Sequence, residues 1–404
     1  RIFTNDAGEF KPQILAEAIN LEIDGLDKQK VFALVAANKT EELFKYLLIV
    51  QCNALSNVLP GMFQRIEDYT ELLLPDYLLR DGSAIEQMIA AIPESDWTDQ
   101  VQIIGWLYQY YNSELKDKVF ADLKKNVKIS KENIPAATQL FTPDWIVHYM
   151  VENSLGRLWL EGHSNDALKS EWKYYLDEAA QEDSVQIELE KIRADFAALK
   201  PEDIRVIDPC AGSGHILCVL FDVLVRIYEA YGYTAREAAA KIVENNLWGL
   251  DIDDRAAQLA YFAVMMKARR YDRRFFTRNV KPHIFAIHES NAIREDYPDA
   301  KHYFHLSQEN QAALDYLIDA FADAKEYGSI IQLAPRDYIA LQREWATVNL
   351  DGLFYAPLAA EITLLIEQAI ALTQKYQVVA TNPPYLGSAR FSPKLDNYVK
   401  KNIR

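Results

Sequence analysis

The sequence has few cysteines, no long apolar run and no excess of positive charge. Its three cysteines, Cys52, Cys210 and Cys218, are odd in number and lack the spacing of metal ligands. We therefore expect a reduced, cytoplasmic protein without a metal site. No apolar run approaches the ~20 residues of a membrane span and no signal peptide is visible, so we expect no membrane association. Internal repeats and low-complexity segments are also missing.

The formal net charge of −16 argues against a nucleic-acid partner, because phosphates are neutralised by Lys and Arg. Net charge is a whole-chain sum, however, and a local basic surface can coexist with it. Two basic stretches, residues 116–131 and 267–281, qualify, although solvated helix faces are the simpler interpretation of both. Charge therefore decides neither for nor against DNA.

Half of the 404 residues are hydrophobic, enough for more than one core. Residues 1–135 have helical apolar spacing and are predicted to form a helical N-terminal domain. Residues 136–404 are predicted to form an α/β domain with a parallel sheet and a polar helical insertion at about 160–200. The chain lacks an initial Met and stops soon after its most specific motif, which suggests a piece of a longer protein.

A glycine-containing turn follows the first predicted strand, residues 203–208. Asp208-Pro209-Cys210-Ala211-Gly212-Ser213-Gly214 precedes an amphipathic helix, an arrangement that places a nucleotide-like cofactor at the carboxyl edge of a sheet. Gly212 and Gly214 lack Cβ atoms, so the backbone can approach a ligand closely. Asp208 would repel a diphosphate but suits the ammonium and sulfonium groups of S-adenosylmethionine. An α/β turn without a ligand is the alternative.

The next two predicted strands end in further candidate cofactor residues. Residues 247–252 end in Asp251, which can accept hydrogen bonds from ribose hydroxyls, and Ile252, which can pack on adenine. The spacing from Asp208 to Asp251 is longer than usual and predicts an extra helix at 235–244. A third strand, 283–287, leads to Asn291, which would read the cofactor's adenine edge or be a plain loop residue.

A fourth predicted strand, 376–380, runs into Thr381-Asn382-Pro383-Pro384-Tyr385. Two successive prolines fix φ and remove two backbone donors, which leaves rigid carbonyl acceptors beside the Asn382 side chain. Acceptors for both protons of an exocyclic amine would aim its lone pair at a methyl donor, with no catalytic base. Tyr385 can stack on a base that has left a duplex. A proline-stiffened turn with an incidental tyrosine is the alternative.

Together these motifs resemble the gamma-class, adenine-specific DNA amino-methyltransferases, which also carry a Phe-Thr-Pro segment such as Phe141-Thr142-Pro143 ahead of the glycine turn. The resemblance implies a Rossmann-like methyltransferase sheet that transfers a methyl group from S-adenosylmethionine to adenine N6. The catalytic residues would be Asn382, Pro383, Pro384 and Tyr385. The cofactor residues would be Thr142 and Pro143 at the methionine end, then Asp208, Pro209, Cys210, Ala211, Gly212, Gly214, Asp251, Ile252 and Asn291.

Three longer segments, residues 103–110, 134–143 and 249–257, extend the resemblance to the PglX methyltransferases of BREX phage-defence systems. It covers nearly the whole chain. It implies a much longer enzyme that marks double-stranded host DNA at a short asymmetric site and works with other BREX proteins. The remaining strands of the sheet and the target-recognition domain would be missing here, so we expect this chain to be inactive alone.

Other functions share parts of the pattern. Asn-Pro-Pro-Tyr also serves amino-methyltransferases that act on protein glutamine or on guanine N2 of ribosomal RNA. A restriction–modification fusion would need a nuclease in the N-terminal helices, where no Pro-Asp followed by acid–x–Lys occurs in a strand context. A non-enzymatic sensor of S-adenosylmethionine would need the glycine turn but not Asn382.

Overall fold

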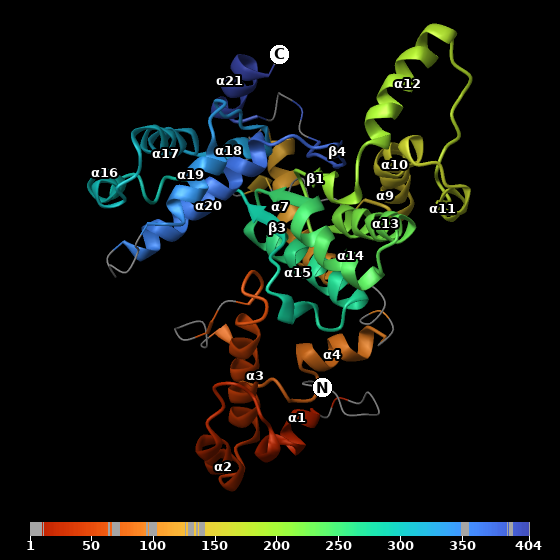
Figure 1. Cartoon of the computed structure of the whole chain (residues 1–404). Helices are drawn as coiled ribbons and strands as arrows, with labels where there is room; N and C mark the ends of the chain where they lie inside the picture. Colours follow the sequence, from red (N-terminus) through yellow and green to blue (C-terminus); the bar gives the residue numbers. More distant parts are fainter. Residues whose placement is uncertain are drawn as a thin grey trace. The chain divides into compact units, whose positions relative to one another are not determined.

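The computed structural model describes residues 10, 12–63, 65–66, 73–93, 96, 103–125, 127, 133–134, 136, 142–348, 355–385, 387 and 391–403 (Figure 1). By its internal contacts the chain forms two compact units, residues 1–103 and residues 104–404. The sequence predicts a boundary after residue 135, whereas the two units divide after residue 103.

The first unit is helical in its described residues. Its α-helices are α1 (Gln13–Ala16), α2 (Lys28–Ala36), α3 (Thr40–Ser56) and α4 (Ala84–Ala91). The longest, α3, buries Leu43, Phe44, Leu47 and Val50 at the spacing of one helix face. Asp27 caps α2, since its carboxylate accepts the N–H groups of the first turn. An amphipathic stripe and caps thus account for these helices.

The second unit is an α/β structure on a small parallel sheet. Its strands are β1 (Val206–Asp208), β2 (Leu247–Asp251), β3 (His283–Ala286) and β4 (Val378–Val379). The order is β3-β2-β1-β4, and all neighbouring pairs are parallel. The predicted α/β class with a parallel sheet is confirmed. The order reverses direction at β1, and ligands of such sheets bind beyond the carboxyl ends of the strands at that point.

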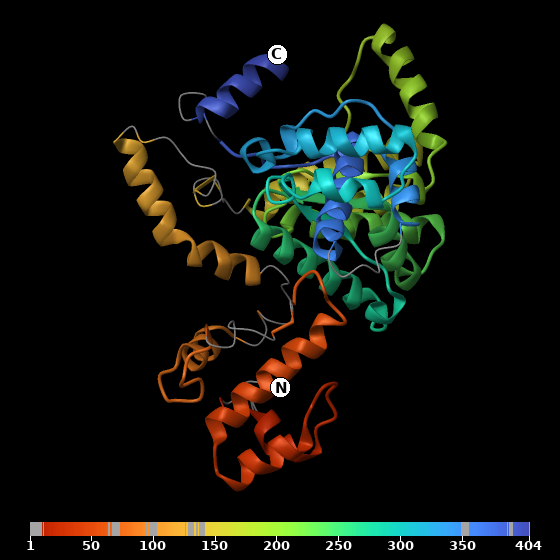
Figure 2. The same ribbon diagram turned by 90° about the vertical axis from the view of Figure 1, so that its left-hand side faces the viewer.

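Helices make up most of the second unit (Figure 2). They are α6 (Ile103–Tyr111), α7 (Ser113–Lys124), α9 (Asp144–Val151), α10 (Arg157–Gly162), α11 (Asp166–Glu171), α12 (Asp183–Ala197), α13 (His215–Tyr231), α14 (Ala235–Lys241), α15 (Asp254–Tyr271), α16 (Tyr297–Ala300), α17 (Gln308–Ala320), α18 (Ala324–Tyr327), α19 (Tyr338–Trp345), α20 (Ala356–Thr373) and α21 (Pro393–Asn402). The predicted polar insertion at 160–200 contains α11 and α12, and α12 buries none of its own residues. The extra helix predicted at 235–244 is α14, followed by a π-helical segment at Ile242–Asn246.

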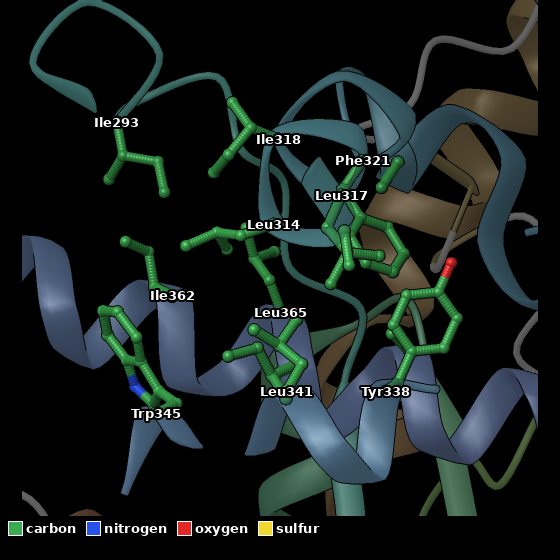
Figure 3. Packing of buried hydrophobic residues seen from close by; sticks show 14 of the residues in the cluster. Ile293, Leu314, Leu317, Ile318, Phe321, Tyr338, Leu341, Trp345, Ile362 and Leu365 are labelled. Atoms are coloured by element: carbon green, nitrogen blue, oxygen red, sulfur yellow. The ribbon is translucent and has the colours of Figure 1, made fainter. Parts of the chain in front are cut away.

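Helices cover both faces of the sheet. On one face, α13 and α15 pack against β1, β2 and β3, and a Cβ at Gly249 would lie 2.8 Å from Leu217 of α13. Trp248 and Leu250, which alternate with Gly249, join the cluster built by α17, α19 and α20 on the other face. Figure 3 shows this cluster, in which Leu314 and Leu317 of α17 meet Leu341 and Leu365. The sheet is therefore the middle of three layers.

Among the described helices, α20 is long and apolar enough to cross a membrane, with a mean hydropathy of 1.3 over 18 residues. Packing explains its composition, because these eight of its residues are buried: Leu358, Ala359, Ile362, Leu365, Ile366, Gln368, Ala369 and Ala371. Ile362 and Leu365 point into the cluster of Figure 3. We interpret α20 as a core helix of the second unit.

Candidate active site

A cavity of about 480 Å³ lies at the carboxyl ends of β1, β2 and β4. Its volume is within the range of ~300–1,000 Å³ that holds small-molecule ligands. The predicted site residues that line it are Pro209, Cys210, Gly212, Asp251, Ile252, Asn382, Pro383 and Pro384. The fold thus brings the glycine turn, the acid after β2 and the Asn-Pro-Pro segment after β4 to one cavity.

The turn after β1 is held by its own backbone. Asp208 is buried, and its carboxylate accepts the N–H of Cys210 at 3.1 Å. The N–H of Ala211 donates to the carbonyl of Leu250 on β2 at 2.8 Å, and the N–H of Gly214 donates back to Ala211 at 2.8 Å. These bonds tie the turn to the neighbouring strand before α13 begins.

The two glycines of this turn have different roles. Both adopt left-handed backbone angles, with φ of +53° at Gly212 and +86° at Gly214. A Cβ at Gly214 would lie 2.8 Å from the Cα of Ala260 on α15, so this glycine permits close packing of two helices. A Cβ at Gly212 would meet nothing within 4 Å. Gly212 therefore faces open space at the cavity wall.

Asp251 uses both carboxylate oxygens to organise the cavity. Oδ2 accepts the N–H of Gly212 at 2.8 Å, and Oδ1 accepts the N–H of Asp253 at 2.9 Å. Each oxygen can accept a further hydrogen bond, such as one from a ribose hydroxyl. Burial raises the pKa of Asp251 to about 6 and that of Asp208 to about 7. The buried carboxyl group of Asp208 and the half-buried one of Asp251 favour a ligand that carries positive charge.

Basic side chains do little to offset this acidity. Lys325 lines the cavity, but its Nζ lies 2.6 Å from Asp254 Oδ2. The described lining residues also include Asp253 and Glu326. Among the described residues, no group of three His, Cys, Asp or Glu side chains is placed to hold a metal ion. The acidic residues Asp251, Asp253 and Glu326 in the wall suit a ligand that carries positive charge.

Asn382 is held by side chains on both sides. Its Nδ2 donates to Thr142 Oγ1 at 2.9 Å, and the Tyr385 hydroxyl donates to its Oδ1 at 2.7 Å. Thr142 is buried, whereas the Tyr385 side chain is 75% exposed. Thr142 does not line the cavity. In this structure the predicted cofactor residue Thr142 contacts the predicted catalytic residue, and the predicted amine acceptor is occupied by Tyr385.

The Thr-Pro part of the predicted Phe-Thr-Pro segment lies directly before α9, while Phe141 lies outside the described residues. Pro143 occupies the N-cap position of α9. Asp144, in the first turn, is 3.2 Å from Nε2 of His215, the first residue of α13. Burial lowers the pKa of His215. This contact joins the segment that carries Thr142 to the helix that follows the glycine turn.

Asn291 is not brought to the cavity. Its Nδ2 donates to Asp323 Oδ1 at 3.0 Å, and its Oδ1 accepts the N–H of Asp323 at 2.8 Å. Both ends of the amide therefore brace a residue whose φ is +54°. Of the other predicted residues, Asp208, Ala211 and Gly214 lie in the turn behind the cavity wall.

Several cavity residues were not predicted from the sequence. They come from the segment 325–330, from α6, from α21 and from scattered positions, namely Lys325, Glu326, Tyr327, Gly328, Ser329, Ile330, Gly105, Gln109, Leu395, Val399, Phe391, Ile134, Ser213, Asp253, Ala256 and Thr381. Gly328 has a φ of +58°, and a Cβ there would lie 2.9 Å from Ile252. A glycine at position 328, within a polar segment, is the sequence signal that could have predicted a tight turn here.

The segment 325–330 and α21 support each other. Tyr327 stacks on Tyr398 of α21 with ring centroids 4.4 Å apart. The Tyr398 hydroxyl accepts the N–H of Gln332 at 2.8 Å, and Ser392 donates to Glu326. Contacts between distant parts of the chain, which no local motif records, complete this wall of the cavity.

Comparisons with known proteins find similarity to methylases and methyltransferases. Residues 245–404 match the family described as Eco57I restriction-modification methylase. Adenine-specific methyltransferase BrxX of Escherichia coli O9:H4 (strain HS) is 40% identical over 398 residues, which are 93% of this chain and 32% of that protein. Adenine-specific methyltransferase PglX of Lacticaseibacillus casei (strain Zhang) is 36% identical over 430 residues, 99% of this chain and 34% of that protein.

A putative type II restriction enzyme and methyltransferase of Methanocaldococcus jannaschii is 33% identical over 132 residues, 30% of this chain and 11% of that protein. The chain thus spans about a third of the length of the first two relatives.

Proposed function

We propose, on the premise that this chain is homologous over nearly its whole length to the adenine-specific methyltransferases BrxX and PglX, that it forms the cofactor-binding and catalytic part of a DNA N6-adenine methyltransferase. One observation carries the proposal. Asn382-Pro383-Pro384, at the end of β4, lines the same cavity as the glycine turn at the end of β1. A methyl donor bound at the glycine turn and an amine bound at Asn382 would therefore share this cavity.

S-adenosylmethionine is the cofactor we propose, bound on a Rossmann-like methyltransferase sheet. It would supply an activated methyl group on a positively charged sulfur. The buried carboxyl of Asp208, the half-buried carboxyl of Asp251 and the open side of Gly212 fit such a ligand. Asp251 would accept the ribose hydroxyls, and Ile252 would pack on the cofactor's adenine. Cys210, whose pKa burial raises to about 11, would stay a neutral thiol in the wall.

The chemistry we propose at Asn382 needs no base. Asn382 Oδ1 and the Pro383 carbonyl would accept the two protons of the adenine amine and hold its lone pair toward the cavity. Pro383 and Pro384 have no backbone N–H, so their segment presents acceptors only. The Tyr385 hydroxyl, now on Asn382 Oδ1, would give up that oxygen to the amine. Its exposed ring would then stack on the flipped base.

The whole protein would act on double-stranded DNA at a specific site in a BREX-type phage-defence system, in the cytoplasm and with other BREX proteins. These points rest on the named relatives, of which this chain spans about a third. We expect the 404 residues alone to show no sequence-specific methylation.

A transfer assay with the full-length protein tests the proposal. Labelled S-adenosylmethionine is offered with adenine-containing duplex DNA, with glutamine peptides or with ribosomal RNA, and the product is identified as N6-methyladenine. Label on glutamine or on guanine N2 would contradict an adenine enzyme. Long-read mapping of N6-methyladenine in cells with and without the gene gives the recognition site. DNA cleavage that requires a divalent metal would instead favour a restriction–modification fusion.

A further inference from the structure

Helix α6 supplies a wall of the cavity that lies outside the motifs described so far. Gly105 and Gln109, one turn apart on α6, line the cavity. Tyr108 follows Gly105 by three residues on the same helix, and its hydroxyl donates to Asp253 Oδ2 at 2.5 Å. Residues 103–111 also fall outside the part of the chain that matches the methylase family, which begins at residue 245.

Asp253 connects this hydrogen bond to the predicted ribose site. Its Oδ1 accepts the N–H of Arg255 at 3.0 Å, as the N-cap of α15. Its own N–H donates to Asp251 Oδ1 at 2.9 Å, and Asp251 Oδ2 accepts the N–H of Gly212. Tyr108, Asp253, Asp251 and the glycine turn thus form one continuous chain of hydrogen bonds.

The Tyr108 hydroxyl affects Asp251 through Asp253. The carboxylate of Asp253 can rotate about its side-chain bonds unless both of its oxygens accept hydrogen bonds. The α15 cap occupies Oδ1 and the Tyr108 hydroxyl occupies Oδ2. With both occupied, the backbone N–H of Asp253 stays aligned on Asp251 Oδ1. The carboxylate plane of Asp251, and with it the direction offered to ribose hydroxyls, is fixed from outside the sheet.

We infer that Tyr108 is a positioning residue that sets cofactor affinity by holding the Asp253 turn against Asp251. This inference rests on the proposed use of S-adenosylmethionine and adds to it a helix that precedes the α/β motifs. Tyr108 is not among the residues that line the cavity. It acts through Asp253, so its loss weakens cofactor binding and leaves the methyl-transfer step at Asn382 unchanged.

Titration calorimetry of the 404-residue chain with S-adenosylmethionine tests this. Tyr108→Phe keeps the ring and removes the hydroxyl, and we expect it to raise the Kd about 5–10-fold, the effect of one hydrogen bond to a charged group acting indirectly. Tyr111→Phe is the matched control, since Tyr111 is 73% exposed on the same helix, and its Kd should equal that of the wild type.

The binding stoichiometry separates positioning from folding. A variant that only folds poorly would bind fewer equivalents at an unchanged Kd, and this result would overturn the inference, as would equal Kd values for Tyr108→Phe and wild type. In the full-length enzyme the KM for S-adenosylmethionine should rise by the same factor, with kcat unchanged at saturation. A wild-type chain that does not bind S-adenosylmethionine would overturn the proposed function itself, and the inference with it.

A double-mutant cycle shows whether Tyr108 acts through Asp253. Asp253→Asn keeps a side chain that can cap α15 but removes the charge. If one hydrogen bond carries both effects, Tyr108→Phe with Asp253→Asn loses no more affinity than the worse single variant. Additive losses would mean that Tyr108 acts by another route and would overturn the inference.

Discussion

The two sides of the cavity are held in different ways. On the cofactor side, Ala211, Gly212 and Gly214 are fixed by backbone N–H groups that donate to β2 or to the turn itself. On the target side, Asn382 is fixed by two side-chain hydroxyls, those of Thr142 and Tyr385. One of these hydroxyls belongs to a side chain that is 75% exposed.

This difference separates what is preformed from what a substrate must rearrange. Backbone hydrogen bonds leave the cofactor side little freedom, so S-adenosylmethionine would enter a site that is already shaped. An exposed tyrosine hydroxyl can be replaced by an amine at modest cost. The target side would therefore reach its working arrangement only when a base arrives.

Asn382→Ala in the full-length enzyme should give the largest effect, with a large loss of kcat on the target side and little change in cofactor affinity. It removes one preorganised acceptor, and losses of about 10²–10³-fold in kcat are typical of such groups. The Kd for S-adenosylmethionine should stay within about twofold of wild type, because the cofactor side does not depend on Asn382. A comparable loss of cofactor affinity would show that the two sides are not separable.

The two glycines of the turn test the cofactor side alone. Gly214→Ala combines a positive φ with a Cβ 2.8 Å from Ala260, so we expect it to lower the free energy of unfolding by about 2–4 kcal/mol. Gly212→Ala has only the backbone cost, about 1–2 kcal/mol. Calorimetric melting of the chain measures both. Equal destabilisation would mean that helix packing does not require a glycine at 214.

Thr142→Val decides to which side Thr142 belongs. The substitution keeps the shape but removes the acceptor for Asn382 Nδ2, and we expect kcat/KM for DNA to fall about 10-fold. Thr142→Ser should restore most of it. If the affinity for S-adenosylmethionine falls instead while turnover at saturation is kept, Thr142 is a cofactor residue, as the family resemblance implied.

The pH dependence of cofactor binding should be the smallest effect. Burial raises the pKa of Asp251 to about 6, so at pH 5 most of the carboxyl is neutral. A cationic ligand favours the carboxylate, and we expect ionisation of Asp251 to raise the affinity about 10-fold from pH 5 to pH 7. Ionisation of Asp208, whose pKa is about 7, should extend the rise above pH 7. Asp251→Asn should bind weakly and flatten the profile.

The same raised pKa affects stability with the opposite sign. The folded protein holds this proton more tightly than the unfolded chain, so the stabilisation present at low pH is lost as pH rises through about 6. Melting without cofactor at pH 5 and pH 7 checks this. A rise in stability attributable to Asp251 over this interval would contradict the assigned direction.

Strands and turns were predictable because their signals are local. The four predicted strands appear as β1 to β4, each within a few residues of its expected bounds. Asp253 caps α15, and short polar side chains such as Asp are the usual residues at this position. An apolar run that ends in Gly, Asp or Pro marks the end of a buried strand, and this local pattern can be read from one sequence.

The rest of the site depends on contacts across long separations. Asn291 follows β3 as a cofactor residue would, yet it braces Asp323, 32 residues away. Tyr108 reaches Asp253 across 145 residues, and Asn382 reaches Thr142 across 240. No periodicity reports such pairs. The sequence motifs therefore predicted the strand ends but not the walls that the segment 325–330, α6 and α21 build around them.

The position of β4 has a consequence for synthesis on the ribosome. Arg205, just before β1, donates its N–H to the side chain of Gln377, 172 residues later. At elongation rates of about 5–20 residues per second, β1 is made about 9–34 s before its second neighbouring strand. During that interval the nascent sheet has an open edge beside its future catalytic groove, where foreign strands could pair. Chaperone capture at the β1 edge should therefore fall once residues 377–380 emerge and pair with β1.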